Sequence, residues 1–143
     1  PNIYLDGAHN LIGIEQLVKS LDGLQRPLTV VFTALKDKDY KPMISLLEEN
    51  FDNVIITEFE FYRAESAENL AGDHKVRIIK NWKDALDEIT KEDLPGTKFV
   101  TGSLYFISDA RAYFKKYIQK PHLKVGISYK ISNSTIRRPI YSF

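Results

Sequence analysis

Leu28-Thr29-Val30-Val31-Phe32 is the stretch that decides the fold. A near-continuous run of apolar and β-branched residues of this length is typical of a strand that is buried on both faces of a sheet. A charged loop, residues 36–39, follows the run, and helical spacing begins near Met43, with Pro42 tolerated in a first helical turn. The stretch therefore predicts one strand–loop–helix unit of an α/β protein.

The same alternation recurs on both sides of this unit. Further strands are predicted at residues 3–5, 54–56, 76–79 and 98–101, and helices at residues 12–21, 64–71, 82–89 and 104–118. Five alternations without an Asn-Gly hairpin signal favour parallel strands joined by helices. We expect a three-layer α/β/α fold with a mostly parallel, Rossmann-like sheet of five or six strands.

The composition excludes several classes of site. The 143 residues are enough for one domain with an ordinary hydrophobic core. The absence of cysteine excludes a disulfide scaffold, a cysteine zinc site and a thiol nucleophile, and three histidines far apart favour no metal site. No apolar run approaches the roughly 18–20 residues of a membrane span, and no signal peptide opens the chain. We expect a cytoplasmic protein that binds no membrane.

The net charge of +1 is unevenly distributed along the chain. Residues 119–143 carry five bases and no acid, which leaves 15 bases against 19 acids, a net charge of −4, in residues 1–118. We expect a domain at 1–118 and a basic C-terminal tail at 119–143. Alternating apolar residues at 125–131 allow the tail to add an edge strand, and a disordered tail is the competing interpretation. The start at Pro1, directly before a strand, suggests a piece of a longer protein.

Polar clusters follow three of the predicted strands, at residues 6–10, 36–39 and 101–103. Ligands of open α/β sheets bind at the carboxyl ends of the strands, so we expect the three clusters to converge. An aspartate at position 6 can accept hydrogen bonds from sugar hydroxyls or hold a metal-bound water, and His9 can donate to phosphate oxygens. The alternative is that Asp6 and Asn10 only cap the next helix.

The other two strand ends have their own candidate residues. Ser103, at a helix N-terminus, can bind a carboxylate or phosphate, although a lone Gly-Ser more often only caps the helix. Lys38 and Arg63 can bind anions. A solvated loop, and stacking of Arg63 on its aromatic neighbours, are the plainer alternatives. The sequence contains neither a Gly-x-Gly-x-x-Gly motif nor a P-loop, so it predicts no nucleotide-binding loop of either kind.

Taken together, the polar clusters resemble a known family. Asp6-Gly7-Ala8-His9-Asn10, residues 34–39 with Met43-Ile44, Arg63-Ala64 and Thr101-Gly102-Ser103-Leu104-Tyr105 are similar to the C-terminal domain of folylpolyglutamate synthase/dihydrofolate synthase, in the Mur ligase family. The resemblance covers residues 1–118. It departs from the family at Leu11, where proline is usual, and in the tail beyond Ile118.

This resemblance implies a function. Enzymes of the family use ATP and magnesium to convert a carboxylate of dihydropteroate or folate into an acyl phosphate, which the amine of L-glutamate attacks. An N-terminal P-loop domain, outside this sequence, would hold most of the magnesium ligands and the folate site. By resemblance, Asp6, His9 and Asn10 would contact the nucleotide, and Ser103, Lys38, Asp39 and Arg63 the glutamate. No catalytic residue and no metal ligand is expected in this chain, and the domain alone is expected to be inactive.

Two other functions stay open at this point. One is a stand-alone flavodoxin-like module that binds a small anion without catalysis. The gene upstream of Pro1 distinguishes the two: a genuine start codon there would favour the module, and a P-loop in the same reading frame would favour the ligase. The other is nucleic-acid binding through Tyr129, Tyr141 and Phe143 among the five bases of the tail. The short tail and the acidic body disfavour nucleic acid as a partner.

Overall fold

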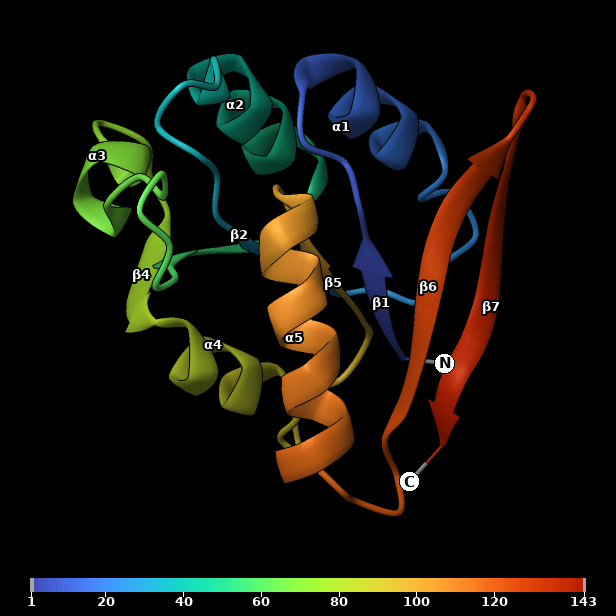
Figure 1. The fold of residues 1–143 in the computed structure, drawn as a ribbon. Coiled ribbons are helices and arrows are strands. Elements are labelled where there is room, and N and C mark those ends of the chain that lie inside the picture. Colours follow the sequence, from blue (N-terminus) through green and yellow to red (C-terminus); the bar gives the residue numbers. More distant parts are fainter. Residues whose placement is uncertain (1, 143) are drawn as a thin grey trace.

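The computed structural model describes residues 2–142 and contains a single twisted sheet with helices on both faces (Figure 1). The strands are β1 (Ile3–Asp6), β2 (Leu28–Phe32), β3 (Asn53–Glu58), β4 (Arg77–Asn81), β5 (Thr97–Thr101), β6 (Lys124–Ile131) and β7 (Ser134–Ser142). The helices are α1 (Leu11–Lys19), α2 (Tyr40–Asn50), α3 (Ala67–Ala71), α4 (Trp82–Ile89) and α5 (Leu104–Tyr117).

The strands lie in the order β4-β3-β2-β5-β1-β6-β7. All neighbours pair in parallel except β6 and β7, which form an antiparallel hairpin. The predicted α/β/α fold with a mostly parallel sheet is confirmed, but the sheet has seven strands rather than five or six. The two additional strands, β6 and β7, come from residues 119–143 and join the same sheet as β1.

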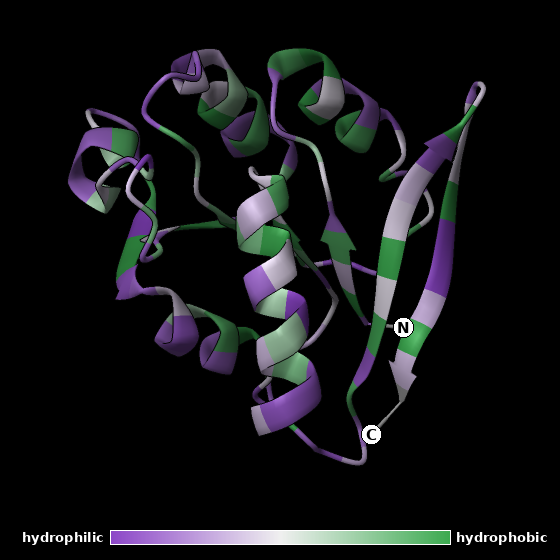
Figure 2. Cartoon of the chain, viewed as in Figure 1, coloured by the Kyte–Doolittle hydropathy of each residue, from purple (hydrophilic) through white to green (hydrophobic). Residues whose placement is uncertain are grey.

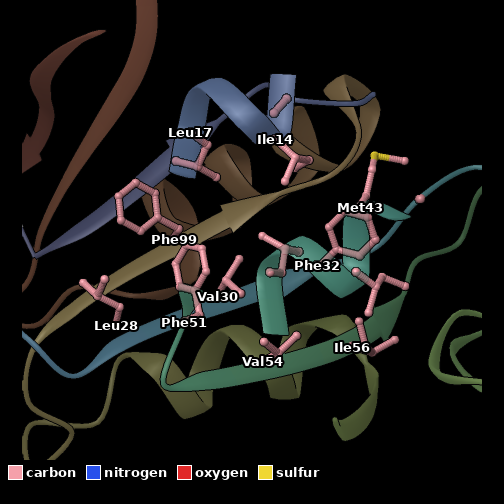
Figure 3. Packing of buried hydrophobic residues seen from close by; sticks show 14 of the residues in the cluster. Ile14, Leu17, Leu28, Val30, Phe32, Met43, Phe51, Val54, Ile56 and Phe99 are labelled. Carbon is pink, nitrogen blue, oxygen red and sulfur yellow. The ribbon is translucent and has the colours of Figure 1, made fainter. Parts of the chain in front are cut away.

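Two apolar layers hold the helices on the sheet because side chains alternate between its faces. On one face, Tyr4, Val30 and Phe32 pack with α1, α2 and α3. On the other face, Ile3, Leu5 and Val31 pack with α4 and α5. Figure 3 shows Ile14 and Leu17 of α1 pointing toward Val30, Phe32 and Phe99 of the sheet. Strand β2 is buried along its whole length, as its apolar run predicts.

Polar side chains fix where the helices begin. The side chains of Asn10, Ser66, Asn81 and Ser103 accept backbone N–H groups at the starts of α1, α3, α4 and α5. Ser66 therefore starts α3 at Ala67, three residues later than the predicted start at 64. Caps at residues 10 and 103 place the first turns of α1 and α5 directly after β1 and β5.

Most of the basic tail lies in the sheet, where it forms strands β6 and β7. Strand β6 pairs with β1, and β7 forms the sheet edge, where it carries a hydrophilic stretch (Figure 2). The guanidinium of Arg137 lies over the rings of Tyr4 and Phe99, 5.3 and 5.4 Å from their centroids. Arg138 lies 5.9 Å from the ring centroid of Tyr129. Pro1 and Phe143 lie outside the described residues.

Candidate functional site

The polar clusters converge because β2, β5 and β1 are neighbours and run in parallel. Their carboxyl ends meet at one end of the sheet, where hydrogen bonds join the loops. The N–H of Gly102 donates to the carbonyl oxygen of Ala8 at 2.9 Å, and the Thr101 hydroxyl donates to the same oxygen at 3.2 Å. The N–H of Thr33 donates to the carbonyl oxygen of Thr101 at 3.4 Å. The three loops therefore form one connected surface.

A cavity of about 220 Å³ opens on this surface, and we call it the strand-end cavity. It is lined by His9, Leu35, Lys38, Arg63, Gly102, Ser103, Leu104 and Tyr105. The lining includes four of the residues predicted from sequence, His9, Lys38, Arg63 and Ser103, which come from four separate segments. Three of the four can carry positive charge and the fourth begins a helix, so the cavity suits a small anion.

Ser103 is 2% exposed and is both a cap and a cavity residue. Its Oγ accepts the N–H groups of Tyr105 at 3.2 Å and Phe106 at 3.4 Å. Ser103 therefore caps α5. A serine hydroxyl that accepts two bonds still has its own proton to donate. Ser103 can thus start α5 and donate to a ligand at the same time.

Gly102 must be glycine for this geometry. Its φ is +116°, a region that side chains rarely adopt, and an added Cβ would lie 1.8 Å from the carbonyl oxygen of Thr33. The close approach brings β5 and the loop after β2 together beneath the strand-end cavity.

Two facing loops hold the cationic residues of the cavity. The N–H of Lys36 donates to the carbonyl oxygen of Arg63 at 2.8 Å, and the guanidinium of Arg63 pairs with the Asp37 carboxylate at 3.1 Å. This exposed pair raises the pKa of Arg63, chiefly through the charge of Asp37. Lys38 lines the cavity, whereas Asp39 is exposed, precedes α2 and lies outside the lining. The structure therefore groups Arg63 with Lys38 and leaves Asp39 apart.

The three residues predicted to contact the nucleotide, at the turn after β1, do not line one common cavity. His9 lines the strand-end cavity, with its Nδ1 3.0 Å from the carbonyl oxygen of Gly7. Asn10 is exposed, and its Oδ1 accepts the N–H of Gly13 at 2.8 Å, so it caps α1 as the plainer alternative predicts. Asp6 lies on the other side of the turn, where its Oδ1 accepts the N–H of Ala8 at 2.9 Å.

Asp6 lines a second cavity, of about 290 Å³, which we call the hairpin cavity. It is bounded by Asp6, Gly7, Ala8, Gly13, Gln16, Leu17, Ser128, Tyr129, Lys130 and Thr135. Burial raises the pKa of Asp6, while the Ala8 N–H and the charge of Arg137 lower it, and the net shift is upward. The hairpin residues around Asp6 were not predicted, because the alternation at 125–131 indicates a strand but not the strand with which it pairs.

Residues 2–142 contain no group of three or more histidine, aspartate or glutamate side chains that could hold a metal ion. Within the same residues, no helix is long and apolar enough to cross a membrane.

Comparison with known proteins gives a match to one family. The family described as Mur ligase, glutamate ligase domain, matches residues 1–103. The matched region contains all three polar clusters and Arg63, so it includes every residue that lines the strand-end cavity except Leu104 and Tyr105.

Individual relatives match over most of this chain. The dihydrofolate synthase/folylpolyglutamate synthase of Bacillus subtilis is 38% identical over 122 residues, which are 80% of this chain and 28% of the relative. The Mycobacterium tuberculosis folylpolyglutamate synthase, in complex with ADP and AMPPCP, has a TM-score of 0.66 at 29% identity and covers 83% of this chain and 31% of that one.

A further solved structure that resembles this chain contains bound L-glutamate. It is a bifunctional folylpolyglutamate synthase/dihydrofolate synthase with Mn, AMPPNP and L-glutamate bound, with a TM-score of 0.68 at 25% identity over 78% of this chain and 29% of that one. The chain thus spans about 30% of the length of the proteins that it matches.

Proposed function

This chain belongs to the Mur ligase family as a glutamate ligase domain, and we propose that it is the C-terminal domain of an ATP-dependent folylpolyglutamate/dihydrofolate synthase. In the proposed reaction ATP phosphorylates a carboxylate of dihydropteroate or folate. The amine of L-glutamate attacks the acyl phosphate, forms an amide and releases phosphate. The observation that carries the proposal is the strand-end cavity, which joins His9, Lys38, Arg63 and Ser103 at the carboxyl ends of the strands.

We propose that the strand-end cavity binds L-glutamate. Ser103 and the first turn of α5 offer a hydroxyl and a helix N-terminus to one carboxylate. Lys38 and Arg63 face the same volume and supply positive charge for a dicarboxylate. Asp39, next to Lys38 but outside the lining, would lie beside the entrance. The related synthase with L-glutamate bound supports this choice of substrate.

The nucleotide would lie across the turn after β1. His9 would donate to phosphate oxygens, and Asp6 would accept hydrogen bonds from sugar hydroxyls, with Asn10 holding the start of α1 between them. Two related structures with ADP, AMPPCP or AMPPNP support a nucleotide. The described residues offer no metal cluster, so magnesium would be held mainly by the N-terminal domain and the substrate phosphates.

The same end of the sheet has the exposed apolar surface that a second domain would cover. Ile12, Tyr62, Leu104 and Tyr105 are 69%, 83%, 59% and 51% exposed, and each follows a strand end. The rings of Tyr62 and Tyr105 both contact the ring of Phe61, with centroids 5.0 and 4.6 Å away. Exposed apolar groups gathered around polar residues are typical of an interaction surface. We propose that the N-terminal P-loop domain of the same enzyme packs here.

The binding proposal is tested by titrating the ¹⁵N-labelled chain with L-glutamate and, separately, with ADP. We expect glutamate to shift the amide signals of residues 38, 63 and 102–106, and ADP to shift those of residues 6–10. Ser103→Ala and Lys38→Ala should each weaken the glutamate response, whereas Lys115→Ala, on the exposed face of α5, should not. Glutamate shifts confined to residues outside the strand-end cavity would overturn the assignment.

A stand-alone anion-binding module is the alternative function. The strand-end cavity, lined by Lys38, Arg63 and His9, favours anion binding under either function. The module predicts that inorganic phosphate and glutamate compete equally well for the cavity and that no P-loop domain precedes Pro1 in the gene. The ligase domain predicts selectivity for glutamate and a P-loop upstream in the same reading frame.

A further inference from the structure

The hairpin cavity lies between α1 and the β6–β7 hairpin, on the opposite side of the β1 turn from the strand-end cavity. The Lys130 ammonium group contacts the Gln16 amide oxygen, and Arg137 donates to the Ser20 carbonyl oxygen at 3.0 Å. These two contacts hold the hairpin against α1, as the adjacent placement of the two elements in Figure 1 also shows. Residues of the hairpin lie beyond the region that the family matches.

Three polar groups line up across this part of the sheet. Asp6 of β1 pairs with Ser128 of β6, and Ser128 pairs with Arg137 of β7. Residues paired directly across neighbouring strands project from the same face of a sheet. Asp6, Ser128 and Arg137 therefore form a short polar row on the face that α1 covers.

Two atoms of this row are buried without a partner. Ser128 is 4% exposed and lines the hairpin cavity, and its Oγ has no hydrogen-bond partner within residues 2–142. The Nε of Arg137 is also buried and unpaired among these residues. A buried hydroxyl without a partner destabilises the folded state, so such groups are nearly always paired in folded proteins. The row is therefore incomplete without a polar ligand or an ordered water.

The chemistry of the row selects a hydroxylated ligand. One oxygen of Asp6 accepts the Ala8 N–H, and the other carboxylate oxygen accepts no hydrogen bond from residues 2–142, so it can accept one from a hydroxyl group of a ligand. Ser128 can accept from, or donate to, a second hydroxyl beside the first. The negative charge of the Asp6 carboxylate would repel a free anion. A metal ion would have only one carboxylate ligand in this cavity. Vicinal hydroxyl groups satisfy both side chains at once.

We propose that Asp6 and Ser128 form a subsite for vicinal hydroxyl groups, and that the hairpin thereby completes the sugar-binding part of the nucleotide site. This inference rests on the proposed function, and it adds a specificity-determining residue, Ser128, that lies outside the family match. The nucleotide would place its phosphates near His9 and its sugar in the hairpin cavity, on the two sides of the β1 turn.

The test compares ADP with 2′,3′-dideoxy-ADP as probes of the complete 143-residue chain, by NMR titration. The variants are Ser128→Ala and the matched control Ser134→Ala, which changes an exposed serine of the same hairpin. We expect wild type to bind ADP more tightly than the dideoxy compound. Ser128→Ala should weaken ADP binding by about 3- to 10-fold, the loss of one hydrogen bond, and leave dideoxy-ADP binding unchanged. Ser134→Ala should change neither.

The other outcomes show whether the hydroxyl subsite alone fails or the proposed function fails with it. If ADP binds and Ser128→Ala changes the two affinities equally or not at all, the hydroxyl subsite is wrong, a buried water completes the row, and nucleotide binding stands. If the chain responds to L-glutamate at the strand-end cavity but to ADP nowhere, the subsite is wrong and the glutamate assignment stands. If it responds to neither ligand, both proposals are overturned.

Discussion

Gly102 controls, at the scale of single residues, how closely β5 approaches the loop after β2. We expect Gly102→Ala to lower the free energy of unfolding by at least about 3 kcal/mol, because the new Cβ would collide with the Thr33 carbonyl in a left-handed backbone region. Gly23→Ala is the matched control. Gly23 also has positive φ, 83°, but no atom lies within 4 Å of an added Cβ, so about 1 kcal/mol is expected. Urea denaturation measures both, and equal losses would contradict the close approach.

Ser103 is predicted to have two separable roles. Ser103→Ala should cost about 1 kcal/mol of stability through the lost cap of α5, and it should also weaken glutamate binding. Ser66→Ala, at the cap of α3, should cost a similar amount of stability and leave glutamate binding unchanged. Thermal melts and glutamate titrations of the two variants separate the roles. Equal glutamate affinity in both variants would limit Ser103 to capping.

The sequence predicted that the polar loops at the strand ends converge. It did not predict the residues that surround Asp6. His9, Lys38, Arg63 and Ser103 line one cavity, as expected if parallel strands carry their loops to one end of the sheet. Asp6 was grouped with His9 because the family resemblance implies that both contact the nucleotide. In the structure their side chains lie on opposite sides of the turn, and a sequence does not reveal that direction without the fold.

At the scale of elements, β5 contains a buried lysine. Lys98 is 2% exposed, and its Nζ donates to the Leu94 carbonyl oxygen at 2.5 Å. Burial lowers its pKa below the usual value. The folded protein therefore binds this proton less well than the unfolded chain does, so the charged lysine costs stability at pH 7. That cost falls as the pH rises from the folded-state pKa toward 10.5, the unfolded value.

We expect Lys98→Met to raise the free energy of unfolding at pH 7 by on the order of 1 kcal/mol, because the methionine keeps the apolar stem and removes the charge. The advantage over wild type should shrink as the pH approaches 10.5. Denaturation at pH 7 and pH 10 measures both effects, with Lys115→Met on the exposed surface of α5 as the control. A less stable Lys98→Met at pH 7 would show that the Leu94 contact outweighs the burial of the charge.

The elements that were predicted correctly are those with strong local signals. Buried strands such as β2 and helices with polar caps, such as α4 after Asn81, have local patterns that tertiary structure did not override. The β6–β7 hairpin was missed as a pair because its two-residue turn, Ser132-Asn133, lacks the Asn-Gly signal. Ser132 nevertheless adopts a φ of 56°. Pairing of β6 with β1, over 100 residues away in sequence, has no local signal at all.

At the scale of the whole molecule, the proposed anion binding depends on local geometry rather than on net charge. Residues 1–118 have a net charge of −4 with histidine counted as neutral, yet the cations Lys38 and Arg63 line the strand-end cavity together with His9. Part of the basic tail is used within the molecule, where Arg137 packs on Tyr4 and Phe99. These contacts leave fewer bases of the tail for a nucleic-acid strand.

We expect the 143 residues alone to release no ADP from ATP in the presence of folate and L-glutamate. The proposed reaction needs a P-loop to hold the triphosphate, and this sequence contains none. A coupled assay of ADP formation makes the measurement. Glutamate-dependent ADP formation that persists after repeated purification would contradict the proposal that a separate P-loop domain holds the triphosphate.

The most direct test of the central claim, that this chain is the glutamate ligase domain of a folate-linked synthase, is a chimera. The chain replaces the matching segment of the Bacillus subtilis synthase, and glutamate-dependent ADP release is measured with dihydropteroate or folate as acceptor. We predict that the chimera is active and that Lys38→Ala or Ser103→Ala raises its KM for glutamate. A chimera that folds and binds ATP but adds no glutamate would contradict the claim.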